Sequence, residues 1–72
     1  PPTVEEIEDI RQLARAVDGV IDVHDIAIHS YGKDKFASIH IEIDADEKPA
    51  RAHDISEKVE ETLGKKLGVS PT

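Results

Sequence analysis

The fold of this chain is decided by residues 36–43, which read FASIHIEI in one-letter code. One row of alternate positions is apolar: Ala37, Ile39, Ile41 and Ile43. The interleaved row is mostly polar: Phe36, Ser38, His40 and Glu42. Because successive side chains of a strand point to opposite faces, this pattern predicts a strand with one buried face and one polar face. His40 lies in the middle of the polar row.

An earlier strand is predicted from Val20 onward, where the period also becomes two. Ile26 and Ile28 share one face of it, and Asp25, Ala27 and His29 share the other. A polar segment containing a glycine, residues 31–35 (YGKDK), separates the two predicted strands. Two alternating segments joined by a short glycine-containing turn predict a β-hairpin.

The pairing of these strands is restricted because both isoleucine rows must face the same core. Two registers satisfy that condition. One places Ala27 opposite His40, with His29 diagonal to it, and the other places Asp25 opposite His40. In both registers we expect His40 on the open face of the sheet with His29 and Asp25 near it.

His24 departs from the alternation, since it has the parity of Ile26 although it is polar. Two explanations are compatible with this position at the start of a strand. One is a special role for the imidazole, and the other is a β-bulge, which inserts one extra residue into a strand.

Helical periodicity flanks the hairpin on both sides. Residues 3–6 (TVEE) form a capping-box pattern, which predicts a helix over roughly residues 4–17. Its apolar side chains recur at helical spacing: Val4, Ile7, Ile10, Leu13, Ala14 and Val17. Gly19 follows where a helix end favours a left-handed residue.

After the charged residues 44–48, Pro49 suits the first turn of a second helix. Its apolar stripe is predicted to consist of Ala52, Ile55, Val59 and Leu63. The predicted order is α-β-β-α, which makes residues 1–72 one α+β domain, and a further strand is expected to be just beginning at Val69.

The composition limits the classes of function. With a formal net charge of −7 and only two aromatic residues, the chain lacks the basic stripe and the stacking platform of a nucleic-acid-binding domain. No apolar run approaches the roughly 20 residues that span a bilayer. The sequence begins at Pro1 without Met and stops at Thr72, so we expect a piece excised from a longer protein. A domain of this size needs help to be stable, and without Cys that help must come from a metal or a partner subunit.

Four histidines are the candidate metal ligands: His24, His29, His40 and His53. Together with carboxylates such as Asp25 they suit zinc, iron(II), manganese or another divalent ion. His40 is the strongest candidate because of its place on the polar face. For His29 an exposed side chain without a role is the simpler interpretation, and His53 fits a solvated helix equally well. The spacings match neither a His-Glu-x-x-His helix nor an EF-hand, and no nucleophile and base are paired, so no enzyme is predicted.

Three segments resemble the cytoplasmic domain of the cation diffusion facilitator family. Residues 17–26 (VDGVIDVHDI) are similar to the family's opening pattern V-x-G-V-x-x-V-H-D-L/I. Residues 36–44 resemble its second strand, in which His and Glu alternate with apolar residues. Residues 52–55 (AHDI), with Val59 and Glu60, are similar to its second helix. The resemblance covers nearly the whole chain in the right order.

This resemblance implies a ferredoxin-like domain of order α-β-β-α-β, here with its last strand truncated or only begun. Such a domain lies on the cytoplasmic side of a membrane, below six transmembrane helices of the same polypeptide, and forms a homodimer. The resemblance further implies that it binds metal, zinc before other divalent ions, at or near the dimer interface. Rising cytoplasmic metal then favours export by proton exchange.

The resemblance also assigns residues. His24, His40 and His53 occupy ligand positions of the family, Asp25 follows the motif without a clear ligand role, and His29 has no counterpart. A further histidine of the family lies on the third strand, beyond Thr72 here. Two alternatives stay open: a metal-independent dimerisation module of the same family, and a free-standing ferredoxin-like domain that binds a small molecule. A thermal melt with and without metal separates the first alternative from metal sensing.

Overall fold

The first helix forms as its capping residues predict. The computed structural model describes residues 2–67, and in it helix α1 spans Val4–Arg15. The Glu6 N–H donates to Thr3 Oγ1 at 3.1 Å, and the Thr3 N–H donates to the Glu6 carboxylate at 3.3 Å, so the capping box is confirmed. The helix ends two residues before the predicted boundary, with Ala16 as its C-cap. Gly19 does adopt a positive φ of 97°, but in the turn beyond the helix.

The predicted hairpin is confirmed as strands β1, Asp22–Tyr31, and β2, Asp34–Glu42, which pair antiparallel. Only Gly32 and Lys33 form the turn, since Tyr31 pairs with Asp34. The turn is therefore shorter than the predicted segment 31–35. Gly32 has a φ of 60°, a conformation that side chains with a Cβ rarely adopt.

Of the two predicted registers, the one with Ala27 opposite His40 is wrong, and the one with Asp25 opposite His40 holds only near the turn. His40 lies opposite His24, neither opposite Ala27 nor opposite Asp25. From Tyr31 to Ala27 the strands follow the register predicted with Asp25 opposite His40, since Ile28 lies opposite Ala37, but the pairing shifts by one residue between Ala27 and His24. There the two residues Asp25 and Ile26 oppose a single residue of β2, which is the signature of a β-bulge. The bulge explanation of the irregular position of His24 is thus confirmed.

The bulge has a clear cause in the distribution of apolar residues. Val23 is 1% exposed and belongs to the core, and Ile26 and Ile28 pack against the same core. Val23 has odd parity whereas both isoleucines have even parity, so no regular strand can direct all three to one face. One inserted residue resolves the conflict.

Helix α2 spans Pro49–Leu67 and begins at the predicted proline. It continues through Gly64, which is buried, and Ile55, Val59 and Leu63 of the predicted stripe are buried as well. Ala52, the fourth member of the stripe, is half-buried. The strand expected from Val69 lies outside the described residues. None of the helices described within residues 2–67 is long and apolar enough to cross a membrane.

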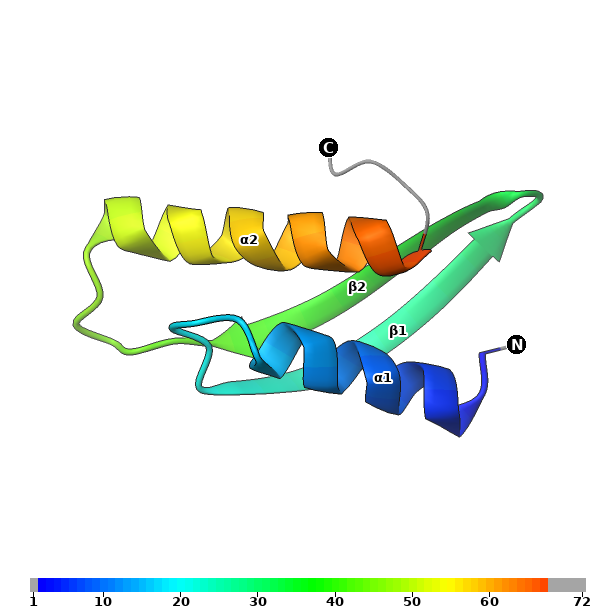
Figure 1. Ribbon diagram of the computed structural model, residues 1–72, viewed down its shortest axis with the longest axis horizontal. Coiled ribbons are helices and arrows are strands. Elements are labelled where there is room, and N and C mark those ends of the chain that lie inside the picture. The colour runs from blue at the N-terminus through cyan, green and yellow to red at the C-terminus, as the bar shows by residue number, and fades with distance from the viewer. Residues whose placement is uncertain (1, 68–72) are drawn as a thin grey trace.

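The elements form two layers, with α1 and α2 packed side by side over the hairpin (Figure 1). The observed order α1-β1-β2-α2, with an antiparallel sheet, is an α+β arrangement consistent with the ferredoxin-like class. The buried hydrophobic side chains of the described residues are few: Ile10, Ala14, Val23, Ile55, Val59 and Leu63. They lie between the helices and the hairpin, so the opposite face of the sheet is left open.

The turn between α1 and β1 packs directly against α2. At Gly19 a Cβ atom would lie 2.5 Å from Ile55 Cδ1 and 2.9 Å from Ile55 Cγ1. The Arg51 guanidinium of α2 also binds this turn, because it donates to the Asp18 carboxylate at 2.9 Å. Glycine is required here both by its positive φ and by this close approach.

We expect Gly19→Ala to lower the free energy of unfolding by about 2–4 kcal/mol, because unfavourable φ and overpacking each contribute about 1–3 kcal/mol. Gly32→Ala is the matched control, since Gly32 also has a positive φ but nothing lies within 4 Å of the position that a Cβ would take there. The free energy of unfolding of Gly32→Ala should fall by only about 1 kcal/mol. Urea denaturation of both variants measures the difference. Equal losses would contradict the contact between Gly19 and Ile55.

Candidate metal centre

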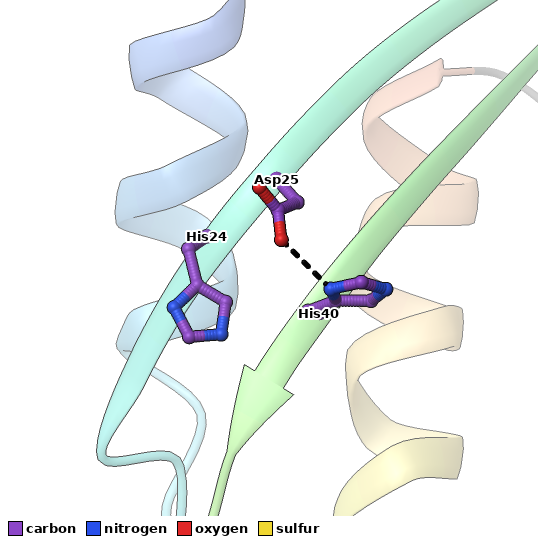
Figure 2. Close-up of side chains that lie close together, drawn as sticks. All are labelled: His24, Asp25 and His40. Atoms are coloured by element: carbon purple, nitrogen blue, oxygen red, sulfur yellow. Dashed lines mark hydrogen bonds and ion pairs between the residues drawn. The ribbon is translucent and has the colours of Figure 1, made fainter.

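Two histidines and one aspartate gather on the open face of the hairpin. His24 and Asp25 come from β1 and His40 comes from β2 (Figure 2). Each offers one ligand atom such that all three atoms lie within 4.8 Å of one another. In the close-up the two helices lie behind the strands, so the three side chains project away from the core. All three are exposed.

The β-bulge is what brings His24 and Asp25 to the same face. In a regular strand consecutive side chains point to opposite faces, and one of the two would be directed into the core. Asp25 instead has a φ of 56°, the left-handed conformation, and is the one non-glycine residue with positive φ among residues 2–67. Aspartate is among the few residues that tolerate this conformation. The left-handed backbone at Asp25 thus places the side chains of two consecutive residues on the same face, where both are candidate ligands.

His40 is held by its neighbours on β1. Its Nδ1 lies 2.9 Å from Asp25 Oδ2, a hydrogen bond in which the imidazole donates when Nδ1 carries the proton. Its ring meets that of His24 edge to face, with the centroids 6.1 Å apart and the planes at 90°. Figure 2 shows Nδ1 of His40 turned toward Asp25 and the second ring nitrogen turned away. A cation between the three residues would therefore meet His40 through Nδ1.

The donor set fits a divalent metal of intermediate softness. Imidazole and carboxylate together suit zinc and iron(II), and each binds zinc at about 2.0–2.2 Å. Around a tetrahedral ion of that size ligand atoms lie about 3.3 Å apart, so three atoms within 4.8 Å of one another require only a modest adjustment by side-chain rotation. Three protein ligands leave at least one coordination position open.

The surroundings of the cluster are acidic. Asp22 of β1 lies opposite Glu42 of β2, two positions along each strand from His24 and His40. Because side chains two positions apart share a face, both carboxylates lie on the face of the cluster. The paired segments at this end of the hairpin, residues 22–24 and 40–42, contain no lysine or arginine. Together with the formal net charge of −7, these carboxylates favour the approach of a cation.

The two other candidate histidines lie away from this cluster. His29 pairs with Phe36 closer to the turn, next to the edge-to-face pair of Tyr31 and Phe36. His53 is on α2, where its Nε2 lies 2.6 Å from Glu57 Oε1 one turn later. The expectation that His29 would lie diagonal to His40 came from the register with Ala27 opposite His40, which is wrong.

Sequence reasoning identified all three members of the cluster but missed how they meet. The available signal was the change of parity between Val23 and Ile26, which requires an inserted residue at positions 24–25. It also missed Arg11, whose guanidinium reaches β1 beside the cluster. No local pattern marks that contact, because it joins residues twelve positions apart.

Comparison with known protein families identifies a match over nearly the whole chain. The family model described as "Cation efflux protein, cytoplasmic domain" matches residues 2–72, which is nearly the whole chain. The name of that family refers to a dimer. Searches of curated proteins and of solved structures found no match.

The strained conformation of Asp25 can be tested without metal. In a chelating buffer we expect Asp25→Ala to be about 1 kcal/mol less stable than Asp25→Gly, because alanine is disfavoured at positive φ and glycine is not. Both variants lose the carboxylate equally, so the difference reports the backbone alone. Chemical denaturation followed by circular dichroism provides the measurement. An alanine variant as stable as the glycine variant would argue against the bulge geometry.

Proposed function

The chain belongs to the cation efflux family as its cytoplasmic domain, and on this premise we propose that it is the metal-sensing, dimerising unit of a divalent-cation/proton antiporter. The observation that carries the proposal is the cluster of His24, Asp25 and His40 on the open face of the sheet. The family is one of transporters, so the cluster is interpreted as regulatory and not as catalytic.

The three residues act as ligands to one divalent ion. His40 Nδ1 and Asp25 Oδ2, which share a hydrogen bond, would both hold the ion; a doubly protonated His40 would release one proton on binding, whereas a neutral His40 would keep its proton on the other ring nitrogen. Zinc is the first candidate, and iron(II), manganese and other divalent ions suit the same donors. A bound divalent cation also offsets part of the negative charge at this end of the sheet.

Dimerisation follows from the open character of the site. The side chains of His40 and Asp25 are 71% and 72% exposed, and three ligands do not complete the coordination of a metal ion. The same face carries the exposed aromatic pair of Tyr31 and Phe36, which are 67% and 55% exposed. A second protomer packed on this face would cover the rings and approach the metal. A C2 homodimer is the simplest closed assembly.

Metal and dimerisation are linked in this proposal. Two copies of a chain with a formal net charge of −7 repel one another, and bound cations reduce that repulsion. A ligand that binds the dimer more tightly than the monomer shifts the population toward the dimer. In the full-length transporter, the six-helix membrane domain of the same polypeptide would respond to this approach of the two protomers by favouring export.

His53 is not a member of the three-residue cluster. Its pairing with Glu57 on α2 places an imidazole and a carboxylate one helical turn apart, which is a two-ligand arrangement. We assign it to a second, weaker metal position. This assignment keeps His53 distinct from the main site in any titration.

Isothermal titration with zinc should rank the ligands. We expect His40→Ala and His24→Ala each to weaken the tighter site tenfold or more, about 1.4 kcal/mol, and Asp25→Gly to weaken it less. His29→Ala is the matched control on the same face and should leave the affinity unchanged. His53→Ala should lower the stoichiometry while the tighter site keeps its affinity.

Circular dichroism confirms that each variant is folded, as expected for exposed positions. If His29→Ala abolishes binding while His40→Ala leaves it intact, the assignment is wrong and the metal lies nearer the turn of the hairpin.

Sedimentation velocity tests the link between metal and assembly. Wild-type protein should shift from monomer toward dimer when saturating zinc is added, because the cation lowers the repulsion and adds shared coordination. The shift should be lost in His40→Ala and retained in His29→Ala. A dimer that is equally stable in chelator would support the metal-independent module instead, and a strict monomer at high protein concentration with zinc would contradict dimerisation of residues 1–72.

A further inference from the structure

A partly buried arginine of α1 reaches the strand that carries the metal cluster. Arg11 Nη1 donates to the backbone carbonyl of Val23 at 2.6 Å. The Arg11 Nε also donates to Glu8 Oε2 at 3.2 Å, one helical turn earlier, which orients the guanidinium. Val23 directly precedes His24, so the contact lies at the entrance to the bulge.

Val23 is fixed from three directions. Its side chain is 1% exposed in the core, its N–H donates to Asp22 Oδ1 at 2.9 Å, and its carbonyl accepts from Arg11. The carbonyl of Val23 belongs to the same rigid peptide plane as the N–H of His24. A hydrogen bond to that carbonyl therefore fixes the orientation of the peptide plane that leads into His24, and this orientation helps to set the direction of the His24 side chain.

The bulge needs such an anchor. Asp25 is in the left-handed conformation, which is unfavourable for a residue with a Cβ, and a bulge interrupts the regular ladder of hydrogen bonds. A hydrogen bond from a charged donor is stronger than one between neutral groups, and here it is partly buried. It links the helical layer to the strand at the position where the ladder is irregular.

We propose that Arg11 is a positioning residue for the metal centre. It holds the Val23–His24 peptide so that His24 and Asp25 both face His40, and it does so without touching the metal. This inference rests on the proposed function, because it assumes that the cluster binds a divalent ion. It adds a residue on α1, outside the sheet, to the determinants of affinity.

The test uses one substitution at two arginines of the same helix. Arg11→Met keeps the apolar stem but removes the donor, and Arg15→Met removes the same charge from an exposed position one turn later. We expect Arg11→Met to weaken zinc binding about tenfold and Arg15→Met less than about twofold. Arg11→Lys, which restores a charged donor, should recover most of the affinity.

Cobalt(II) provides a readout that a loss of stability alone would not change. At saturating cobalt(II), the visible absorption reports the ligand geometry, so it should differ between Arg11→Met and wild type and coincide between Arg15→Met and wild type. If Arg11→Met is not folded by circular dichroism, Arg11→Gln takes its place, with the same expected direction. Its shorter amide is neutral and reaches the carbonyl less well.

The two proposals fail in different ways. Wild-type protein that binds neither zinc nor cobalt(II) would overturn the proposed function, and the role of Arg11 with it. Wild-type protein that binds through His24 and His40, with Arg11→Met matching Arg15→Met in affinity and in spectrum, would overturn the positioning role alone.

Discussion

The inserted residue in β1 is the constraint on which the rest of the molecule depends. Val23 and Ile26 must both face the core, yet their parities differ, so the strand accommodates one extra residue between them. The same insertion turns His24 and Asp25 to the outer face together. Packing on one side of the sheet and the candidate ligands on the other therefore share a single cause. A substitution that restored regular pairing would disturb both.

The small core explains why the open face matters. A domain of about this size buries only around 60–65% of the surface that its unfolded chain exposes, and both helices cover the same side of the hairpin. Few side chains are fully buried among residues 2–67, and the ion pairs of α2 are exposed and contribute little. Under the proposed function, metal binding and self-association on the uncovered face add to that stability. Stability and metal response are then thermodynamically linked.

The extent of prediction from sequence differs from element to element. The capping box at Thr3, the first turn at Pro49 and the alternation through His40 report local geometry, and each was predicted correctly. The register was predicted correctly only near the turn, by the pairing with Asp25 opposite His40, because the regular alternation was extended past Asp25, where the bulge shifts the pairing by one residue. His29 was expected diagonal to His40 because of the other register, with Ala27 opposite His40, which is wrong. Arg11 gave no local signal at all.

The sequence by itself determined the order of helices and strands, the polar face that carries His40 and the identity of the available donors, because these follow from residue type and short-range periodicity. The tertiary structure decided which donors meet. Val23 is buried only when α1 and α2 pack on the hairpin, and this burial requires the bulge that pairs His24 with His40. Contacts between residues far apart in the chain, such as Arg11 with Val23, depend on that packing and not on local spacing.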